Sequence, residues 1–144
     1  MMQGPTTIIL VRHAEPLVGD NPGLTSMGNE RAKLLAFMLQ NAGITSIFIS
    51  ELRRTKETAA PLAAKTGLTP VVLAGVDSIP HRDRVLAAPA GVAVVVGHTN
   101  TVPSLVSALG AGVVQIGATE FDRMFIVSQS TAGMAKALSL RYRV

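Results

Sequence analysis

The chain has 144 residues and a mass of 15.0 kDa, which predicts one domain over residues 1–144 and leaves no room for a second core. Its 48% hydrophobic and 15% charged residues exclude an intrinsically disordered chain, because such chains bury too little apolar surface to fold. The formal charge of +4 favours anionic partners, and the absence of cysteine excludes disulfides, thiolate metal sites and cysteine nucleophiles.

Several classes of partner and location are disfavoured by the same composition. Aromatic residues make up 3% of the chain and the longest basic run is Arg53-Arg54, so nucleic-acid binding is not expected. Residues 1–10 have no basic leader, and the longest apolar stretch, 86–97, is broken by Pro89 and is shorter than the roughly 20 residues that span a bilayer. We therefore expect a cytoplasmic protein that does not bind membranes.

Strands and helices are predicted to alternate over the first two thirds of the chain. Gly43 and Gly67 are expected as left-handed caps at the ends of the first two helices, and Pro61 is expected to kink the second. The predicted strands are 6–11, 46–50, 70–73, 92–96, 121–128 and 134–143, and the predicted helices are 26–42 (after Thr25 or Ser26 as N-cap), 52–66, 83–88 and 101–109.

This alternation predicts right-handed βαβ units, a mostly parallel sheet and an α/β fold, in which ligands bind beyond the carboxyl ends of the strands. Polar segments follow three predicted strands at that edge: residues 12–15, 50–54 and 97–100. We expect them to converge on one pocket. The apolar segment 110–117 is expected to cover a strand edge or a partner, and the oligomeric state is not predicted.

Three ordered motifs carry a family resemblance. Arg12-His13-Ala14-Glu15, the segment Ser50-Glu51-Leu52-Arg53-Arg54-Thr55-Lys56-Glu57-Thr58, and Gly97-His98-Thr99-Asn100 each follow a predicted strand. Together they resemble the histidine phosphatase superfamily, the phosphoglycerate mutase-like group, and the short chain resembles its SixA-like branch. The resemblance implies a three-layer α/β/α sandwich of the phosphoglycerate mutase type.

The resemblance also implies roles for individual residues. His13 is the nucleophile that becomes phosphorylated, Arg12 and Arg54 hold the phosphate, and His98 is the second histidine that contacts it. These residue types suit the chemistry, because a neutral imidazole is nucleophilic and planar guanidinium groups match the oxygens of a transferred phosphoryl group. Backbone N–H groups of Thr99 and Asn100 are expected to contribute at a helix N-terminus.

Three carboxylates are candidates for the general acid of the predicted site. A phosphomonoester needs an acid to protonate the departing oxygen. The interval between Arg54 and His98 has to hold a helix and two strands, so no long acid-bearing insertion fits. Asp77, just after the third predicted strand, is the first candidate, and Glu15 and Glu51 are the alternatives.

Other polar residues are expected to have simpler roles. His81 has no motif around it and is expected to be structural. The side chains that form a solvated basic rim are expected to be Arg53, Lys56, Arg82 and Arg84. No spacing of histidines and carboxylates matches a metal site, so neither a metal nor another cofactor is expected.

The sequence thus predicts a metal-independent phosphatase that works through phosphorylated His13. The expected partner is a phosphohistidine protein or a small phosphorylated molecule. A phosphohistidine substrate needs less acid assistance, because its imidazole leaving group departs more readily than an alkoxide. The alternatives are a phosphotransferase of the phosphoglycerate mutase type and a catalytically poor phosphate-binding module.

Overall fold

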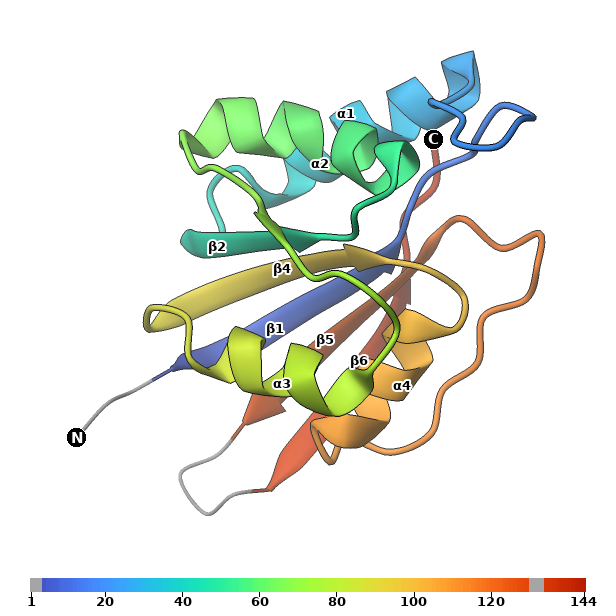
Figure 1. The fold of residues 1–144 in the computed structure, drawn as a ribbon. Coiled ribbons are helices and arrows are strands. Elements are labelled where there is room, and N and C mark those ends of the chain that lie inside the picture. Colours follow the sequence, from blue (N-terminus) through green and yellow to red (C-terminus); the bar gives the residue numbers. More distant parts are fainter. Residues whose placement is uncertain (1–3, 130–133) are drawn as a thin grey trace.

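The fold is taken from a computed structural model that describes residues 4–129 and 134–144 (Figure 1). The strands in this part of the chain are β1 (Pro5–Arg12), β2 (Ile44–Ile49), β3 (Val71–Val72), β4 (Gly91–Gly97), β5 (Arg123–Gln129) and β6 (Ala135–Arg141). The helices are α1 (Ser26–Leu39), α2 (Arg53–Thr66), α3 (Ser78–Leu86) and α4 (Thr101–Ala108). None of these helices has both the length and the apolar composition needed to cross a membrane.

The strands form one sheet in the order β3-β2-β4-β1-β5-β6. The first four strands of the chain pair in parallel, whereas β5 is antiparallel to β1 and β6 is antiparallel to β5. The predicted α/β fold with a mostly parallel sheet is therefore confirmed. In this register Arg12 pairs with Gly97, so β1 and β4 end side by side.

The helices form a layer on each face of the sheet, as Figure 1 shows, with α1 and α2 on one side and α3 and α4 on the other. Successive residues of a strand point to opposite faces. Accordingly, Ile8 and Leu10 of β1 pack toward α3 and α4, whereas Ile9 and Val11 pack toward α1 and α2. This strand is buried on both faces, which explains its continuous apolar sequence.

Two predicted helix boundaries are wrong. Helix α1 ends at Leu39 rather than Ala42, because the next residues form a tight turn in which the N–H of Ala42 donates to the carbonyl of Leu39; Gly43 follows with φ 74°. Helix α3 begins at Ser78 rather than at residue 83. Pro80 lies in its first turn, where the missing N–H would have had no partner within the helix.

The other predicted elements lie within a few residues of the observed ones. Helix α2 continues through Pro61 and ends at Gly67, whose φ of 73° is the left-handed cap that was predicted. The segment 110–117 forms no strand or helix, and its partly buried Ala111, Val114 and Ile116 pack against the core on the α3 and α4 side. This segment therefore covers part of the protein's own core.

Candidate active site

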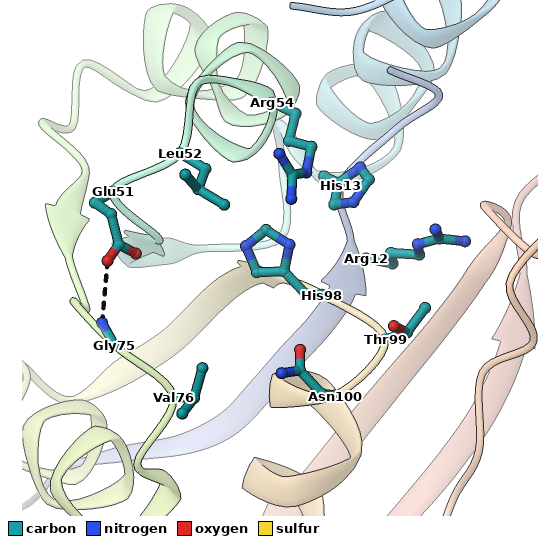
Figure 2. Close-up of a pocket in the computed structure, with 10 residues that line it drawn as sticks. All are labelled: Arg12, His13, Glu51, Leu52, Arg54, Gly75, Val76, His98, Thr99 and Asn100. Atoms are coloured by element: carbon teal, nitrogen blue, oxygen red, sulfur yellow. Dashed lines mark hydrogen bonds between the residues drawn. The ribbon is translucent and has the colours of Figure 1, made fainter. Parts of the chain in front are cut away.

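The three polar segments converge on one cavity at the carboxyl ends of β1, β2 and β4 (Figure 2). The cavity has a volume of about 630 Å³ and is lined by Arg12, His13, Glu51, Leu52, Arg54, Gly75, Val76, His98, Thr99 and Asn100. A neighbouring hollow of about 450 Å³ lies against the loop of residues 16–22 and shares Arg12, His13 and Arg54. The cavity and the neighbouring hollow are thus lined by the arginine and histidine residues of the motifs, Arg12, His13, Arg54 and His98.

His13 is held so that one ring nitrogen is free. Its Nδ1 lies 2.8 Å from the carbonyl oxygen of Ala14, and because a carbonyl only accepts, Nδ1 carries the hydrogen. In the neutral ring the lone pair is then on Nε2. The backbone on either side is fixed, since the N–H of His13 donates to Gly97 and the N–H of Ala14 donates to Oγ1 of Thr58 in α2.

The surroundings keep His13 neutral. The side chain is buried, with 4% of the residue exposed. Burial, together with the nearby His98, Arg12 and Arg54, lowers the pKa of His13 to about 4, although the bond to the Ala14 carbonyl opposes the shift. At neutral pH the ring therefore has the lone pair that a nucleophile needs.

His98 and Arg54 face His13 across the cavity. The ring centroids of His13 and His98 are 5.2 Å apart, and Figure 2 shows the Arg54 guanidinium extending into the space beside both rings. Burial and then the charge of Arg54 lower the pKa of His98. Nε2 of His98 lies 2.9 Å from Oγ of Ser50. Two neutral rings and one guanidinium group thus surround a space suited to an anion.

Arg12 is placed differently from the sequence expectation. Its Nη1 donates to the carbonyls of Ala118 and Glu120, both at 2.9 Å, and its guanidinium lies 3.9 Å from the ring centroid of Phe121. Figure 2 shows the guanidinium turned away from the space between His13 and Arg54. Arg12 therefore contributes positive charge from the cavity wall and is anchored to the loop before β5.

Thr99 and Asn100 lie directly before α4, at the edge of the cavity. Oδ1 of Asn100 accepts from the N–H of Thr101, and Oγ1 of Thr101 accepts from the N–H of His98, both at 2.9 Å. These two bonds fix the turn that joins β4 to α4. The start of α4 consequently faces the cavity, and its helix dipole favours an anion there.

The three carboxylates that were candidates for the general acid lie in different places. Asp77 is exposed at the N-cap of α3 and does not line the cavity. Glu15 is bound by Nε and Nη2 of Arg31, each at 2.9 Å. Glu51 does line the cavity, where its Oε2 accepts from the N–H of Gly75 at 3.2 Å. Of these three carboxylates, Glu51 lines the cavity, whereas Asp77 flanks α3, which begins earlier than predicted.

Several residues that organise the site had no role in the sequence analysis. Ser50, Thr55 and Thr58 belong to the second motif, and their hydroxyls bond to His98, Ser50 and Ala14 respectively. The positions of these three residues within the second motif were the feature of the sequence that could have indicated their roles. Phe121 appeared only as one of few aromatic residues, and its ring lies 6.0 Å from that of His13.

The other polar residues considered in the sequence make local contacts. Nε2 of buried His81 lies 2.9 Å from the carbonyl of Ala74, which is a structural contact. Arg53 pairs with Glu57 and Arg82 pairs with Asp83 at the surface. Within residues 4–129 and 134–144, no cluster of three or more His, Cys, Asp or Glu side chains has a metal-binding arrangement.

Comparison with known proteins identifies similar sequences. Residues 8–81 match the family model described as the histidine phosphatase superfamily, branch 1. The chain is 37% identical over 111 residues to the PE-PGRS family protein PE_PGRS11 of Mycobacterium tuberculosis, an alignment that covers 72% of this chain and 19% of that protein. It is 41% identical over 73 residues to the probable phosphoglycerate mutase GpmB of Yersinia pestis, covering 44% of this chain and 34% of that one.

Solved structures share the fold at lower sequence identity. The protein histidine phosphatase SixA complexed with tungstate superposes with a TM-score of 0.77 at 18% identity, covering 94% of this chain and 96% of that chain. Mycobacterial glucosyl-3-phosphoglycerate phosphatase with inorganic phosphate superposes with a TM-score of 0.66 at 16% identity, covering 96% and 97%. The match over nearly the whole length of both chains agrees with the three-layer α/β/α fold.

Proposed function

The chain belongs to the histidine phosphatase superfamily, branch 1, and we propose that it is a phosphatase that works through a phosphohistidine intermediate on His13. The observation that carries the proposal is the bond from Nδ1 of His13 to the Ala14 carbonyl, which leaves the lone pair on Nε2 in a buried, neutral ring. The other proposed site residues are Arg12, Arg54, His98, Thr99 and Asn100, with Glu51 as the carboxylate that accepts the proton of the attacking water.

In the first step, Nε2 of His13 attacks phosphorus and the bond from phosphorus to the leaving group breaks, with its electron pair going to the leaving group. Arg54 and His98 bind the transferred oxygens, and Arg12 adds positive charge from the cavity wall. Such placed charges are the main contribution a protein makes to phosphoryl transfer. The phosphorylated ring keeps its hydrogen on Nδ1, bonded to Ala14, and so carries a positive charge.

In the second step, water attacks phosphorus and the electron pair of the P–N bond returns to Nε2. His13 then leaves as a neutral imidazole, which is a good leaving group. The carboxylate of Glu51 accepts the proton of the water. This role suits Glu51, because bonds from its own N–H and from the N–H of Gly75 lower its pKa and keep it ionised at neutral pH.

The charge on Glu51 also bears on the substrate. An ionised carboxylate has no proton to give an alkoxide, so simple phosphomonoesters are expected to react slowly. A phosphorylated imidazole takes a proton from water on its distal nitrogen before the P–N bond breaks. We therefore propose protein phosphohistidine as the substrate, in keeping with the fold shared with SixA.

A small phosphorylated metabolite is the second candidate, because the glucosyl-3-phosphoglycerate phosphatase has the same fold. A mutase activity is less favoured, although one relative is named a probable phosphoglycerate mutase. Between Arg54 and His98 the chain forms only α2, β3, α3 and β4, which belong to the sheet and its helical layers. No segment in that interval is free to retain a bisphosphorylated product. The cytoplasm stays the expected location, on the sequence grounds given above.

The deciding experiment is to trap the intermediate. Wild-type protein, His13→Ala and the exposed α4 control Ser107→Ala are incubated with ³²P-labelled phosphohistidine protein and quenched in alkali, in which phosphohistidine is stable. We expect acid-labile label on wild type and on Ser107→Ala, and none on His13→Ala. Equal labelling of His13→Ala would overturn the assignment.

A substrate panel then separates the function classes. It contains phosphohistidine protein, small phosphometabolites and an aryl phosphate, whose leaving group needs little protonation, each assayed with and without a chelator. Turnover of the aryl phosphate is expected for an enzyme. Binding of phosphate without turnover of any member would favour a phosphate-binding module.

A further inference from the structure

His98 is tied to two buried hydroxyl groups that the proposed reaction does not use. Its Nε2 lies 2.9 Å from Oγ of Ser50, and that oxygen lies 2.9 Å from Oγ1 of Thr55. Ser50 is 8% exposed and Thr55 is fully buried, so water does not replace either contact. The three groups form a chain that leads from the cavity to the first turn of α2.

Each hydroxyl has a single hydrogen, which limits how this chain is arranged. Oγ1 of Thr55 accepts from the N–H of Ser50 at 3.1 Å and lies 2.9 Å from the carbonyl of Leu52. If Thr55 donates to Leu52, then Ser50 donates to Thr55 and accepts from Nε2–H of His98. If Thr55 donates to Ser50 instead, then Ser50 donates to a bare Nε2 of His98. The same atoms satisfy both arrangements.

Nδ1 of His98 determines which of the two hydrogen-bond arrangements allows the ring to bind phosphate. Figure 2 shows Nδ1 of His98 on the side that faces His13 and Arg54, away from the nitrogen that Ser50 engages. The dianionic phosphoryl group of a substrate has three terminal oxygens that only accept hydrogen bonds, so Nδ1 must carry a hydrogen to bind it. A neutral imidazole has one hydrogen, and free imidazole side chains prefer to carry it on Nε2.

We propose that the Ser50–Thr55 pair is a reversible hydroxyl relay that keeps a hydrogen on Nδ1 of His98 in both charge states of the ring. In the neutral state Thr55 donates to Ser50 and Ser50 donates to Nε2. In the cationic state Nε2–H donates to Ser50, Ser50 donates to Thr55 and Thr55 donates to the Leu52 carbonyl. Ser50 and Thr55 are thus positioning residues, and the inference rests on the proposed function for its biological meaning.

Both charge states are expected to occur at this site. Burial and Arg54 lower the pKa of His98, so the neutral ring predominates at neutral pH without ligand. A bound phosphate dianion favours the cation. The charged and titratable groups around the ring are His13, Arg12, Arg54 and Glu51. Arg54 and Arg12 disfavour the cation and Glu51 favours it, whereas His13 is itself neutral at neutral pH. A hydroxyl pair that keeps the hydrogen on Nδ1 of the neutral ring would therefore aid phosphate binding.

The tautomers can be measured directly, because the chain has three histidines with distinct contacts. In long-range ¹H–¹⁵N spectra of uniformly ¹⁵N-labelled protein at pH 8, His81 is the reference for a hydrogen on Nε2, since that atom donates to the Ala74 carbonyl. His13 is the reference for a hydrogen on Nδ1. We expect wild-type His98 to resemble His13, and His98 in Ser50→Ala to move toward the pattern of His81.

Binding of inorganic phosphate supplies the functional measurement. At pH 8, Ser50→Ala is expected to bind phosphate about 10- to 100-fold more weakly than wild type, the loss typical of one hydrogen bond to a charged group. The difference is expected to shrink as the pH falls and His98 becomes a cation with hydrogens on both nitrogens. Thr55→Ser keeps the hydroxyl and is expected to bind phosphate as tightly as wild type. Thr55→Val lacks the hydroxyl and is expected to bind phosphate more weakly at pH 8. Ser107→Ala is the control that should not change the affinity.

The inference and the proposed function fail in different ways. A wild-type His98 with its hydrogen on Nε2 at pH 8 would overturn the relay, and this test needs no variant that folds poorly. An unchanged tautomer in Ser50→Ala would also overturn it. Absence of a phosphorylated His13, with the expected His98 tautomers still present, would overturn the proposed function while leaving the hydroxyl relay in place.

Discussion

Nδ1 of His13 lies 2.8 Å from the carbonyl oxygen of Ala14, and this contact decides which nitrogen faces the cavity. The carbonyl is itself held in place, because the N–H of Ala14 donates to Oγ1 of Thr58, also at 2.8 Å. The second motif therefore orients the histidines of the other two motifs, His13 through Thr58 and His98 through Ser50. Substitution of Thr58 in α2 should then alter the reactivity of His13, although Thr58 does not contact the substrate.

Thr58→Val tests this link to His13. The substitution keeps the shape of the fully buried side chain but leaves the N–H of Ala14 without a partner. A buried donor left unpaired costs about 1–3 kcal/mol, so urea unfolding should show a loss of that size. We also expect kcat to fall more than KM changes, because Nε2 is less well aimed. The exposed Lys56→Ala on the same helix should leave both quantities unchanged, and a Thr58→Val enzyme with wild-type kcat would contradict the link.

The pH dependence of the first chemical step follows from the pKa of His13. Burial lowers this pKa to about 4, and only the neutral ring has the lone pair. The ionisation of His13 should therefore cause no loss of phosphorylation rate as the pH falls from 8 toward 5, and should cause a decline with a midpoint near 4, where the ring becomes protonated. Rapid-quench measurement of phospho-His13 formation checks this. A midpoint near 6.5, the ordinary histidine value, would show that the ring is solvated in the resting protein.

The same shift has a consequence for stability. Above about pH 6.5, His13 is neutral in both the folded and the unfolded protein, so it contributes no pH dependence there. Between that value and a pH near 4 the unfolded chain binds a proton that the folded protein does not, and the free energy of unfolding falls. Urea unfolding of wild type and His13→Asn across this range should show a steeper loss for wild type. Parallel curves for the two proteins would contradict the assigned shift.

Arg54 and Arg12 should differ in what they contribute. Arg54 extends into the space beside both histidines, whereas Nη1 of Arg12 is bonded to carbonyls of the loop before β5. Arg54→Lys should lower kcat/KM by about 100-fold, since a single ammonium does not reproduce the guanidinium fork. Arg12→Met, which keeps the length but cannot donate, should lower the stability by about 1–3 kcal/mol, because the Ala118 and Glu120 carbonyls lose their donor. Arg53→Ala, at the exposed neighbouring position, is the control. A larger kinetic effect at Arg53 than at Arg54 would show that the motif spacing selects the wrong arginine.

The order of motifs and strand ends was enough to predict where the site lies. Arg12-His13 and Gly97-His98 each follow an apolar run, and parallel strands bring such ends to one edge. The sequence did not predict the contact between Ser50 and His98, which are 48 positions apart, because it depends on the register of β2 against β4. Nor did it predict the placement of Asp77, because the third helix was expected to begin at residue 83 whereas α3 begins at Ser78.

Glu51→Gln tests the role proposed for this carboxylate. If the ionised carboxylate activates water, its loss should slow the hydrolysis of phospho-His13 by about 100-fold or more while leaving the phosphorylation step nearly unchanged. The labelled intermediate should then accumulate, and a burst of leaving group should precede a slow steady rate. Asp77→Asn, an exposed position outside the cavity, should behave as wild type. The reverse result, with accumulation in Asp77→Asn and normal turnover in Glu51→Gln, would restore the original preference for Asp77 and would require α3 to move its first turn toward His13 when substrate binds.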